Sequence, residues 1–202
     1  MKNKIGKKWS EQLIDSLKLI NSKYVIYCLE DYIFYKNVDM KILNHYLKWV
    51  YLNDANYLRL MPKPKGFKKI DDNIFELGPY SLYKNSLFFT VWNRQLLIKL
   101  LNMYDNPWKF EVLGTLHVRY TDKYYTINNK FMFIYHLVAK GCWIRKSIKK
   151  LKIEKKIIDQ KPIMNPFSEL KWNIKKNLLD LFELVPDNYI KYKIYYFFKR
   201  KK

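Results

Sequence analysis

In the first 60 residues, segments with the apolar spacing of a helix take turns with apolar segments typical of a strand. Residues 10–20 (SEQLIDSLKLI) carry apolar side chains every three or four positions, which predicts a helix capped by Ser10. The apolar run 24–29 (YVIYCL) lacks alternation and predicts a strand covered on both faces of a parallel sheet. A second helical pattern follows Asp39, a good N-cap, and 56–61 predicts another strand. This order of helix, strand, helix and strand is typical of α/β proteins.

The middle of the chain continues with shorter elements. Residues 62–75 begin with PKPKG and predict a loop, and residues 80–90 predict an extended segment. Asn93 is expected to cap a leucine-rich helix, and Asn106, which precedes a proline, is expected to start a short one. Residues 131–138 are apolar and predict a further strand.

After residue 140 the sequence becomes more basic and its patterns are mostly helical. Residues 144–156 (IRKSIKKLKIEKK) predict a basic helix, and a further helix begins after Pro166. The apolar stripe of that further helix consists of Leu170, Ile174, Leu178, Leu181 and Leu184. The tail, 188–202, mixes aromatic residues with lysines. We therefore predict an α/β domain at 1–140 and a basic helical extension at 141–202.

The net charge narrows the classes of partner. The chain has 39 Lys and Arg against 18 Asp and Glu, a formal charge of +21, which favours an anionic partner. Nearly all the basic residues are lysines, whereas proteins that read nucleic acid prefer the bidentate fork of arginine. The charge therefore supports an anionic partner without selecting one: the basic segments could lie on an anionic bilayer or equally follow a nucleic-acid backbone, and solvated helix faces are the alternative. For the chain as a whole we expect an anionic membrane surface as partner and do not expect nucleic acid.

The cysteines and the longest apolar runs bear on location. Cys28 and Cys142 lie far apart in apolar settings and form no CxxC pattern, which predicts two buried free thiols in a reducing cytoplasm. No apolar run approaches the roughly 20 residues that a bilayer-spanning helix needs. We predict a cytoplasmic protein that is soluble or peripheral to the inner face of the cell membrane.

The first candidate site is the acidic pair Glu30-Asp31, which directly follows the strand predicted at 24–29. Ligands of open α/β sheets bind beyond the carboxyl ends of the strands. Mg²⁺ or Mn²⁺ bridging a diphosphate needs only one or two protein carboxylates, because phosphate and water supply the other ligands. The alternative is a turn in which Asp31 is a cap and Glu30 is solvated.

The second candidate site is the helix start NPWKFE at 106–111. Trp108 and Glu111 are three residues apart and so share one helical face, where an indole can stack on a sugar and a carboxylate can act as general base. Trp92 and Arg94 precede another helix and are further candidates for substrate binding. The alternative is a structural role for each, with the tryptophans in the core and the arginine solvated.

Several of these motifs occur together in one order. The segments are KKWSEQLIDSLKLINSKYVIYCLEDYIFYKNVD (7–39), YSLYKNSLFFTVWNRQLLIKLL (80–101), NPWKFE (106–111) and VAKGCWIRKSI (138–148). In this order they resemble a family of bacterial glycosyltransferase-like proteins associated with surface polysaccharide synthesis. The resemblance covers about residues 7–150 and implies a partial GT-A-like (Rossmann-like) mixed sheet flanked by helices. It also implies that this chain lacks the N-terminal segment that family members carry before the Trp-Ser start.

The resemblance assigns roles to particular residues. Asp31 and Glu30 resemble the acidic pair that binds a divalent metal, Mn²⁺ or Mg²⁺, and the donor diphosphate, although Glu-Asp stands here where Asp-Asp is common. Glu111 resembles the acid near the acceptor, and Trp108 would line the acceptor pocket.

The resemblance predicts transfer of a sugar from a nucleotide-sugar donor to a glycan or lipid-linked acceptor. Two alternatives stay open from the sequence: a non-catalytic basic module that binds an anionic membrane or nucleic acid, and an inactive fragment.

Overall fold

The computed structural model describes residues 6–63, 65–104, 106–152, 161–184, 189–190 and 192–194. The chain divides into two compact units that interleave along the sequence. The first consists of Met1–Cys28, Asn44–Lys130 and Pro186–Lys202, and the second of Leu29–Leu43 and Phe131–Val185. The division into an α/β domain at 1–140 and a basic helical extension at 141–202 stays a prediction, and residues 195–202 of the basic tail lie outside the described residues.

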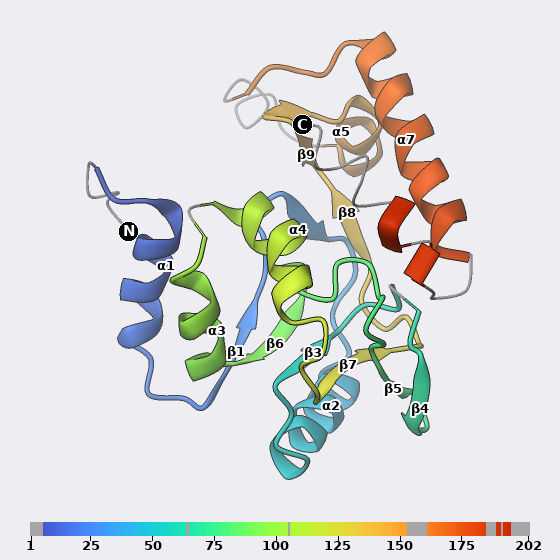
Figure 1. The fold of residues 1–202 in the computed structure, drawn as a ribbon. Coiled ribbons are helices and arrows are strands. Elements are labelled where there is room, and N and C mark those ends of the chain that lie inside the picture. The colour runs from blue at the N-terminus through green and yellow to red at the C-terminus, as the bar shows by residue number, and fades with distance from the viewer. Residues whose placement is uncertain are drawn as a thin grey trace. The chain divides into compact units, whose positions relative to one another are not determined.

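The first unit is built on a six-stranded sheet in the order β1-β6-β3-β7-β5-β4 (Figure 1). The strands in this order are β1 (Tyr24–Tyr27), β6 (Thr90–Asn93), β3 (Tyr57–Arg59), β7 (Tyr124–Ile127), β5 (Ile74–Glu76) and β4 (Lys68–Asp71). Strands β3 and β7 are parallel, and the other neighbours are antiparallel. The structure therefore confirms an α/β fold with a mixed sheet flanked by helices.

Two predictions about strands were wrong. The strand at 24–29 does not lie inside a parallel sheet: β1 ends at Tyr27, pairs antiparallel with β6, and is at an edge of the sheet with Ile26 exposed. The loop predicted at 62–75 contains the hairpin β4–β5, which turns at residues 72–73. The apolar run of β1 therefore did not indicate a strand covered on both faces, and β4, at the other edge of the sheet, shows that an edge strand needs little apolar content.

Helices cover both faces of this sheet. On one face lie α1 (Trp9–Lys18), α3 (Arg94–Leu101) and α4 (Pro107–His117) (Figure 1). The Phe110 ring of α4 contacts the rings of Trp9 and Trp92 on this face. The other face is covered by α2 (Met40–Leu52), whose Trp49 ring contacts Tyr125 edge-on at 4.9 Å. Alternating residues of β3, β6 and β7 thus enter two aromatic-rich core layers.

Three of the predicted helix caps are confirmed. The side-chain oxygens of Asp39, Asn93 and Asn106 accept hydrogen bonds from backbone N–H groups in the first turns of α2, α3 and α4. The prediction of Ser10 as a cap was wrong, because α1 begins one residue earlier and Ser10 is buried inside it. The Glu11 carboxylate accepts from the Lys8 N–H at 2.9 Å in place of a serine cap.

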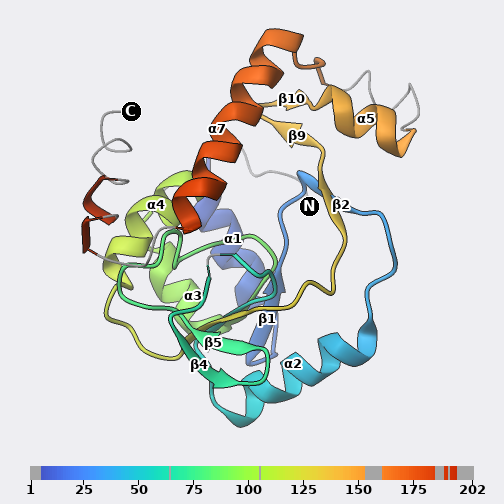
Figure 2. The same cartoon turned by 90° about the vertical axis from the view of Figure 1, so that its right-hand side faces the viewer.

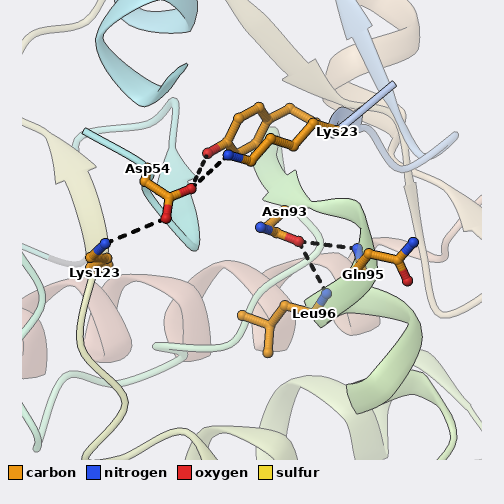
Figure 3. A network of polar contacts seen from close by, with 7 residues as sticks. Lys23, Asp54, Asn93, Gln95, Leu96 and Lys123 are labelled. Atoms are coloured by element: carbon orange, nitrogen blue, oxygen red, sulfur yellow. Dashed lines mark hydrogen bonds and ion pairs between the residues drawn. The ribbon is translucent and has the colours of Figure 1, made fainter. Parts of the chain in front are cut away.

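An ion-pair network joins the turn after α2 to the starts of two strands (Figure 3). The Lys23 Nζ donates to Asp54 Oδ1 at 2.7 Å, and the Lys123 Nζ lies 3.6 Å from Asp54 Oδ2. The hydrogen bond from Lys23 and the charges of both lysines lower the pKa of the Asp54 carboxyl. Because all three side chains are exposed, the network orients the turn more than it stabilises the fold.

In the part of the second unit that the structure describes, two small two-stranded sheets lie together with the helices α5 and α7. Strand β2 (Tyr32–Phe34) pairs with β8 (Ile134–His136), and β9 (Val138–Ala139) pairs with β10 (Cys142–Trp143). The helices are α5 (Arg145–Leu151) and α7 (Pro166–Leu184), and Figure 2 shows α7 beside β9 and β10. The basic helix predicted at 144–156 is confirmed as far as Leu151, and residues 153–160 lie outside the described part.

The exposure of the cysteines and the hydropathy of the helices test two further predictions. Both cysteines are free thiols, but Cys28 is exposed and Cys142 is half-buried, so the prediction that both are buried was wrong. Cys28 follows an edge strand, which leaves its side chain uncovered. Within the described residues, no helix combines the length and the apolar character that crossing a bilayer requires.

Candidate functional site

Two rows of side chains, one aromatic and one polar, lie on one face of the first unit's sheet, and the candidate site lies beside the polar row. Tyr57 is opposite both Trp92 and Tyr124 in the strand register, and these three rings form a buried row. Arg59, two residues further along β3, is opposite Thr90 and Thr126 and lies on the same face. The face therefore changes from aromatic to polar toward the end of β3.

An irregular buried segment, residues 81–87, lies next to this polar row. The backbone of Tyr83 has a positive φ of 52°, and most side chains of the segment are buried although it forms no strand. The prediction of an extended segment at 80–90 is thus wrong except for the start of β6 at Thr90. A buried irregular segment must satisfy its backbone polar groups by contacts other than a sheet ladder.

Helix α4 provides those contacts. The Asn85 backbone N–H donates to Thr115 Oγ1 at 3.1 Å, and its Nδ2 donates to the Phe110 carbonyl at 2.8 Å. Gly114 makes this approach sterically feasible, because a Cβ at this position would lie 2.4 Å from Asn85 Nδ2. The side chain of Lys84, also buried, donates to the carbonyls of Arg119 and Thr121.

Glu111 is the acidic member of this arrangement. One of its oxygens, Oε1, accepts from the Leu87 N–H at 2.7 Å and from Ser86 Oγ at 2.9 Å. Among the residues that the structure describes, the other oxygen, Oε2, has no hydrogen-bond partner. The side chain is half-buried. A carboxylate held through one oxygen is fixed in position and still has a second oxygen with which to accept a proton or a hydroxyl group.

The charges of Glu111 and Arg59 both act on the buried Tyr57. Burial raises the pKa of the Tyr57 phenol well above its ordinary value, with a smaller raising effect from Glu111 and an opposing effect from Arg59. The phenol therefore stays protonated and keeps its O–H donor at any physiological pH. Tyr57, Arg59 and Ser86 were missed by sequence reasoning, and only the polar triplet KNS at 84–86 inside an aromatic stretch signals the segment.

The predicted substrate-binding residues have three different environments. Trp108, on the first turn of α4, is 45% exposed and presents an indole surface to solvent. Trp92 is fully buried between the rings of Tyr57 and Phe110. The Arg94 guanidinium donates to the carbonyls of Ser22 and Leu17 and so connects α3 to the end of α1. Trp92 and Arg94 thus occupy structural positions, whereas Trp108 is accessible.

The acidic pair Glu30-Asp31 belongs to the second unit, where it forms the turn before β2. Glu30 is exposed and Asp31 is half-buried. Burial and the neighbouring Glu30 raise the pKa of the Asp31 carboxyl, and Lys161 opposes them. Two carboxylates in one turn match in number what Mg²⁺ or Mn²⁺ needs from a protein when phosphate and water supply the remaining ligands.

The structure groups some of the predicted residues and separates others. Trp108 and Glu111 share the start of α4 in the first unit, and Glu30 and Asp31 share a turn in the second. In the described part of the chain, no three His, Cys, Asp or Glu side chains converge as a metal-ligand group. The His117 ring contacts the Tyr104 hydroxyl through Nδ1 and so connects the end of α4 to the segment after α3.

Comparisons with known proteins found no matching family model, no matching curated protein and no matching solved structure.

Proposed function

We propose that this chain is a glycosyltransferase-like protein with a partial GT-A-like fold, which transfers a sugar from a nucleotide-sugar donor to a glycan or lipid-linked acceptor in surface polysaccharide synthesis. One observation carries the proposal: the Glu111 carboxylate is fixed through one oxygen on the same helical turn as the exposed indole of Trp108. This is the NPWKFE motif on which the resemblance to such proteins partly rests.

The proposed chemistry at α4 is general-base activation of an acceptor hydroxyl. Ser86 Oγ and the Leu87 N–H hold Oε1, which leaves Oε2 of Glu111 to accept the hydroxyl proton as the acceptor oxygen attacks the donor sugar. The Trp108 ring would stack on the apolar C–H face of the acceptor sugar and orient that hydroxyl. A base of this kind supplies a factor of about 10²–10⁴ in rate.

A conservative substitution tests the role of Glu111. Glu111→Gln keeps an oxygen for Ser86 and Leu87 but cannot accept the proton, so we expect release of nucleoside diphosphate from a panel of nucleotide sugars to fall by about 100-fold or more. Glu76→Gln, at another half-buried glutamate of the same unit, is the matched control. Full activity of Glu111→Gln would leave Glu111 as an anchor of the segment 81–87 and refute the proposed role.

The second part of the proposal concerns the acidic pair. Asp31, with Glu30 beside it, would hold Mn²⁺ or Mg²⁺ against the diphosphate of the donor, and the metal would stabilise the departing diphosphate. Asp31→Asn should weaken nucleoside-diphosphate binding and remove its dependence on Mn²⁺, as measured by calorimetry. Asp72→Asn, at an exposed acid in the β4–β5 turn, is the control. Unchanged affinity and metal dependence in Asp31→Asn would show that the pair is only a turn.

A further inference from the structure

Helix α7 has an apolar stripe that faces solvent. Phe167, Leu170, Ile174 and Leu178 recur every three or four residues, so they lie on one side of the helix. Each of these side chains is between 52% and 65% exposed. The four span 11 residues, or about 16 Å along the helix axis at 1.5 Å per residue. The stripe is thus a continuous exposed surface and not a set of scattered apolar residues.

The other side of α7 fixes the helix on the second unit. The Trp172 ring packs against the apolar cluster of Ala139, Ile144 and Met164. Glu169 is buried, and its Oε1 accepts from the Lys146 N–H at the start of α5. These contacts set the rotation of the helix within its unit, so the exposed stripe is not the side on which α7 packs there.

Over residues 166–178, the exposed charged side chains of α7 all have one sign. Between residues 166 and 178 the exposed charged side chains are Lys171, Lys175 and Lys176, and the single acid, Glu169, is buried. Lys171 and Lys175 follow Leu170 and Ile174 directly and border the stripe along one edge. Helix α5 of the same unit adds four exposed basic residues at 145, 146, 149 and 150.

We propose that this face of α7 binds the surface of an anionic lipid bilayer, with the stripe in the head-group region and the bordering lysines at the lipid phosphates. An apolar stripe edged by lysines on a fixed helix is the pattern of an interfacial amphipathic helix. Pairing of two copies through this face would bring like-charged lysines together, so charge complementarity favours anionic lipid over a second copy. The proposal is independent of sugar transfer and holds for a protein with or without that activity.

Vesicle binding of the full chain tests the proposal. We would measure co-sedimentation with vesicles of phosphatidylcholine alone and of phosphatidylcholine with about a third phosphatidylglycerol. The stripe variant is Leu170→Gln with Ile174→Gln, whose glutamines keep helix propensity. The lysine variant is Lys171→Gln with Lys175→Gln. Matched controls in the first unit are Leu19→Gln with Leu52→Gln, at exposed apolar residues, and Lys68→Gln with Lys69→Gln, at exposed lysines.

We expect the unaltered chain to bind the anionic vesicles only. Its affinity for them should be at least about tenfold higher than that of the stripe variant, and each lysine removed should lower the affinity about fivefold. Both controls should bind like the unaltered chain. Wild-type-like binding by the stripe variant would mean that the lysines alone adhere to lipid, and would overturn the proposal. Absence of binding by the unaltered chain at low salt would overturn it without any variant. A concentration-dependent dimer that the stripe variant dissociates would assign the face to a second copy.

Discussion

At the scale of single residues, the first unit depends on close contacts between a buried irregular segment and helix α4. Glu111 accepts hydrogen bonds from Ser86 and Leu87. Thr115 accepts one from the Asn85 N–H, and Gly114 leaves space for the Asn85 side chain. Such a segment gains little from propensity, so its conformation depends on these few tertiary contacts. Removing one of these contacts should therefore lower the free energy of unfolding by more than a typical surface substitution does.

The glycine of α4 gives the first prediction. In Gly114→Ala the added Cβ would lie 2.4 Å from Asn85 Nδ2, so the hydrogen bond from Nδ2 to the Phe110 carbonyl must stretch or break. Alanine favours a helix more than glycine, but overpacking costs about 1–3 kcal/mol and should dominate. We expect a lower urea midpoint. The double variant Gly114→Ala with Asn85→Ala, which removes the clashing side chain, should recover part of the lost stability. A Gly114→Ala variant more stable than the unaltered chain would contradict this prediction.

The histidine of β8 gives the second prediction. The His136 ring stacks on Tyr32 at 4.4 Å and contacts Trp172, and burial, with a contribution from Lys176, lowers the pKa of His136 to about 4. Its unfolded pKa is near 6.5, so below pH 6.5 the unfolded state binds the proton preferentially. The contribution of neutral His136 to the free energy of unfolding should be fully present above pH 6.5. It should decline as the pH falls toward 4, by at most about 3 kcal/mol.

Urea unfolding between pH 7.5 and about pH 4 measures this dependence. The difference in stability between the unaltered chain and His136→Gln should shrink as the pH falls, and His45→Gln, at an exposed histidine of α2, is the matched control. A constant difference across this range would show that His136 does not contribute to the pH dependence.

At the scale of elements, one arginine connects the C-terminal segment of the first unit to its core. The Arg119 guanidinium lies 4.4–5.5 Å from the ring centres of four tyrosines, two of them beyond α7 in the sequence. These are Tyr80, Tyr120, Tyr189 and Tyr192. A planar guanidinium can stack on several rings at once, which a lysine ammonium does not do equally well.

Removal of that guanidinium is the third prediction. Arg119→Ala should weaken the attachment of Tyr189 and Tyr192 by about 1–2 kcal/mol, and Arg119→Lys should give an intermediate result. Limited trypsin digestion followed by mass spectrometry would measure faster cleavage after Lys193. Arg145→Ala, in the second unit, removes the same charge elsewhere and should not change that cleavage. Equal rates for Arg119→Ala and the unaltered chain would refute the contact's role.

At the scale of the whole molecule, the excess of basic residues is the dominant feature. A formal charge of +21 on 202 residues makes the folded chain repel itself, because folding brings the charges closer together. Exposed ion pairs, such as Lys23 with Asp54, each offset little of this repulsion. Stability should therefore depend on ionic strength more than it does for a neutral protein of this size.

Salt dependence is the fourth prediction. Raising NaCl from about 20 mM to about 300 mM shortens the screening length from roughly 20 Å to below 10 Å. We expect this to stabilise the chain by roughly 1 kcal/mol, seen as a Tm higher by about 2–4 °C. Scanning calorimetry with sucrose of equal osmolality as control separates screening from general solute effects. A Tm that falls with added salt would mean that attractive pairs dominate over repulsion.

The sequence by itself determined those features that depend on neighbouring residues. Asp39, Asn93 and Asn106 predicted their helix starts correctly, because a cap is satisfied by backbone groups two or three residues away. The α/β class followed likewise from the succession of periods along the chain. Trp108 and Glu111 were placed on one helical turn by their spacing alone.

Only the tertiary structure decided which residues meet across long separations. The direction and edge position of β1, the burial of Trp92 and the hydrogen bonds of Arg94 to Ser22 and Leu17 depend on elements distant in sequence. The same holds for the anchoring of Glu111 by residues 86 and 87 and for the exposure of the α7 stripe. Local patterns carry no information on pairing partners, because register and coverage are set by the packing of whole elements.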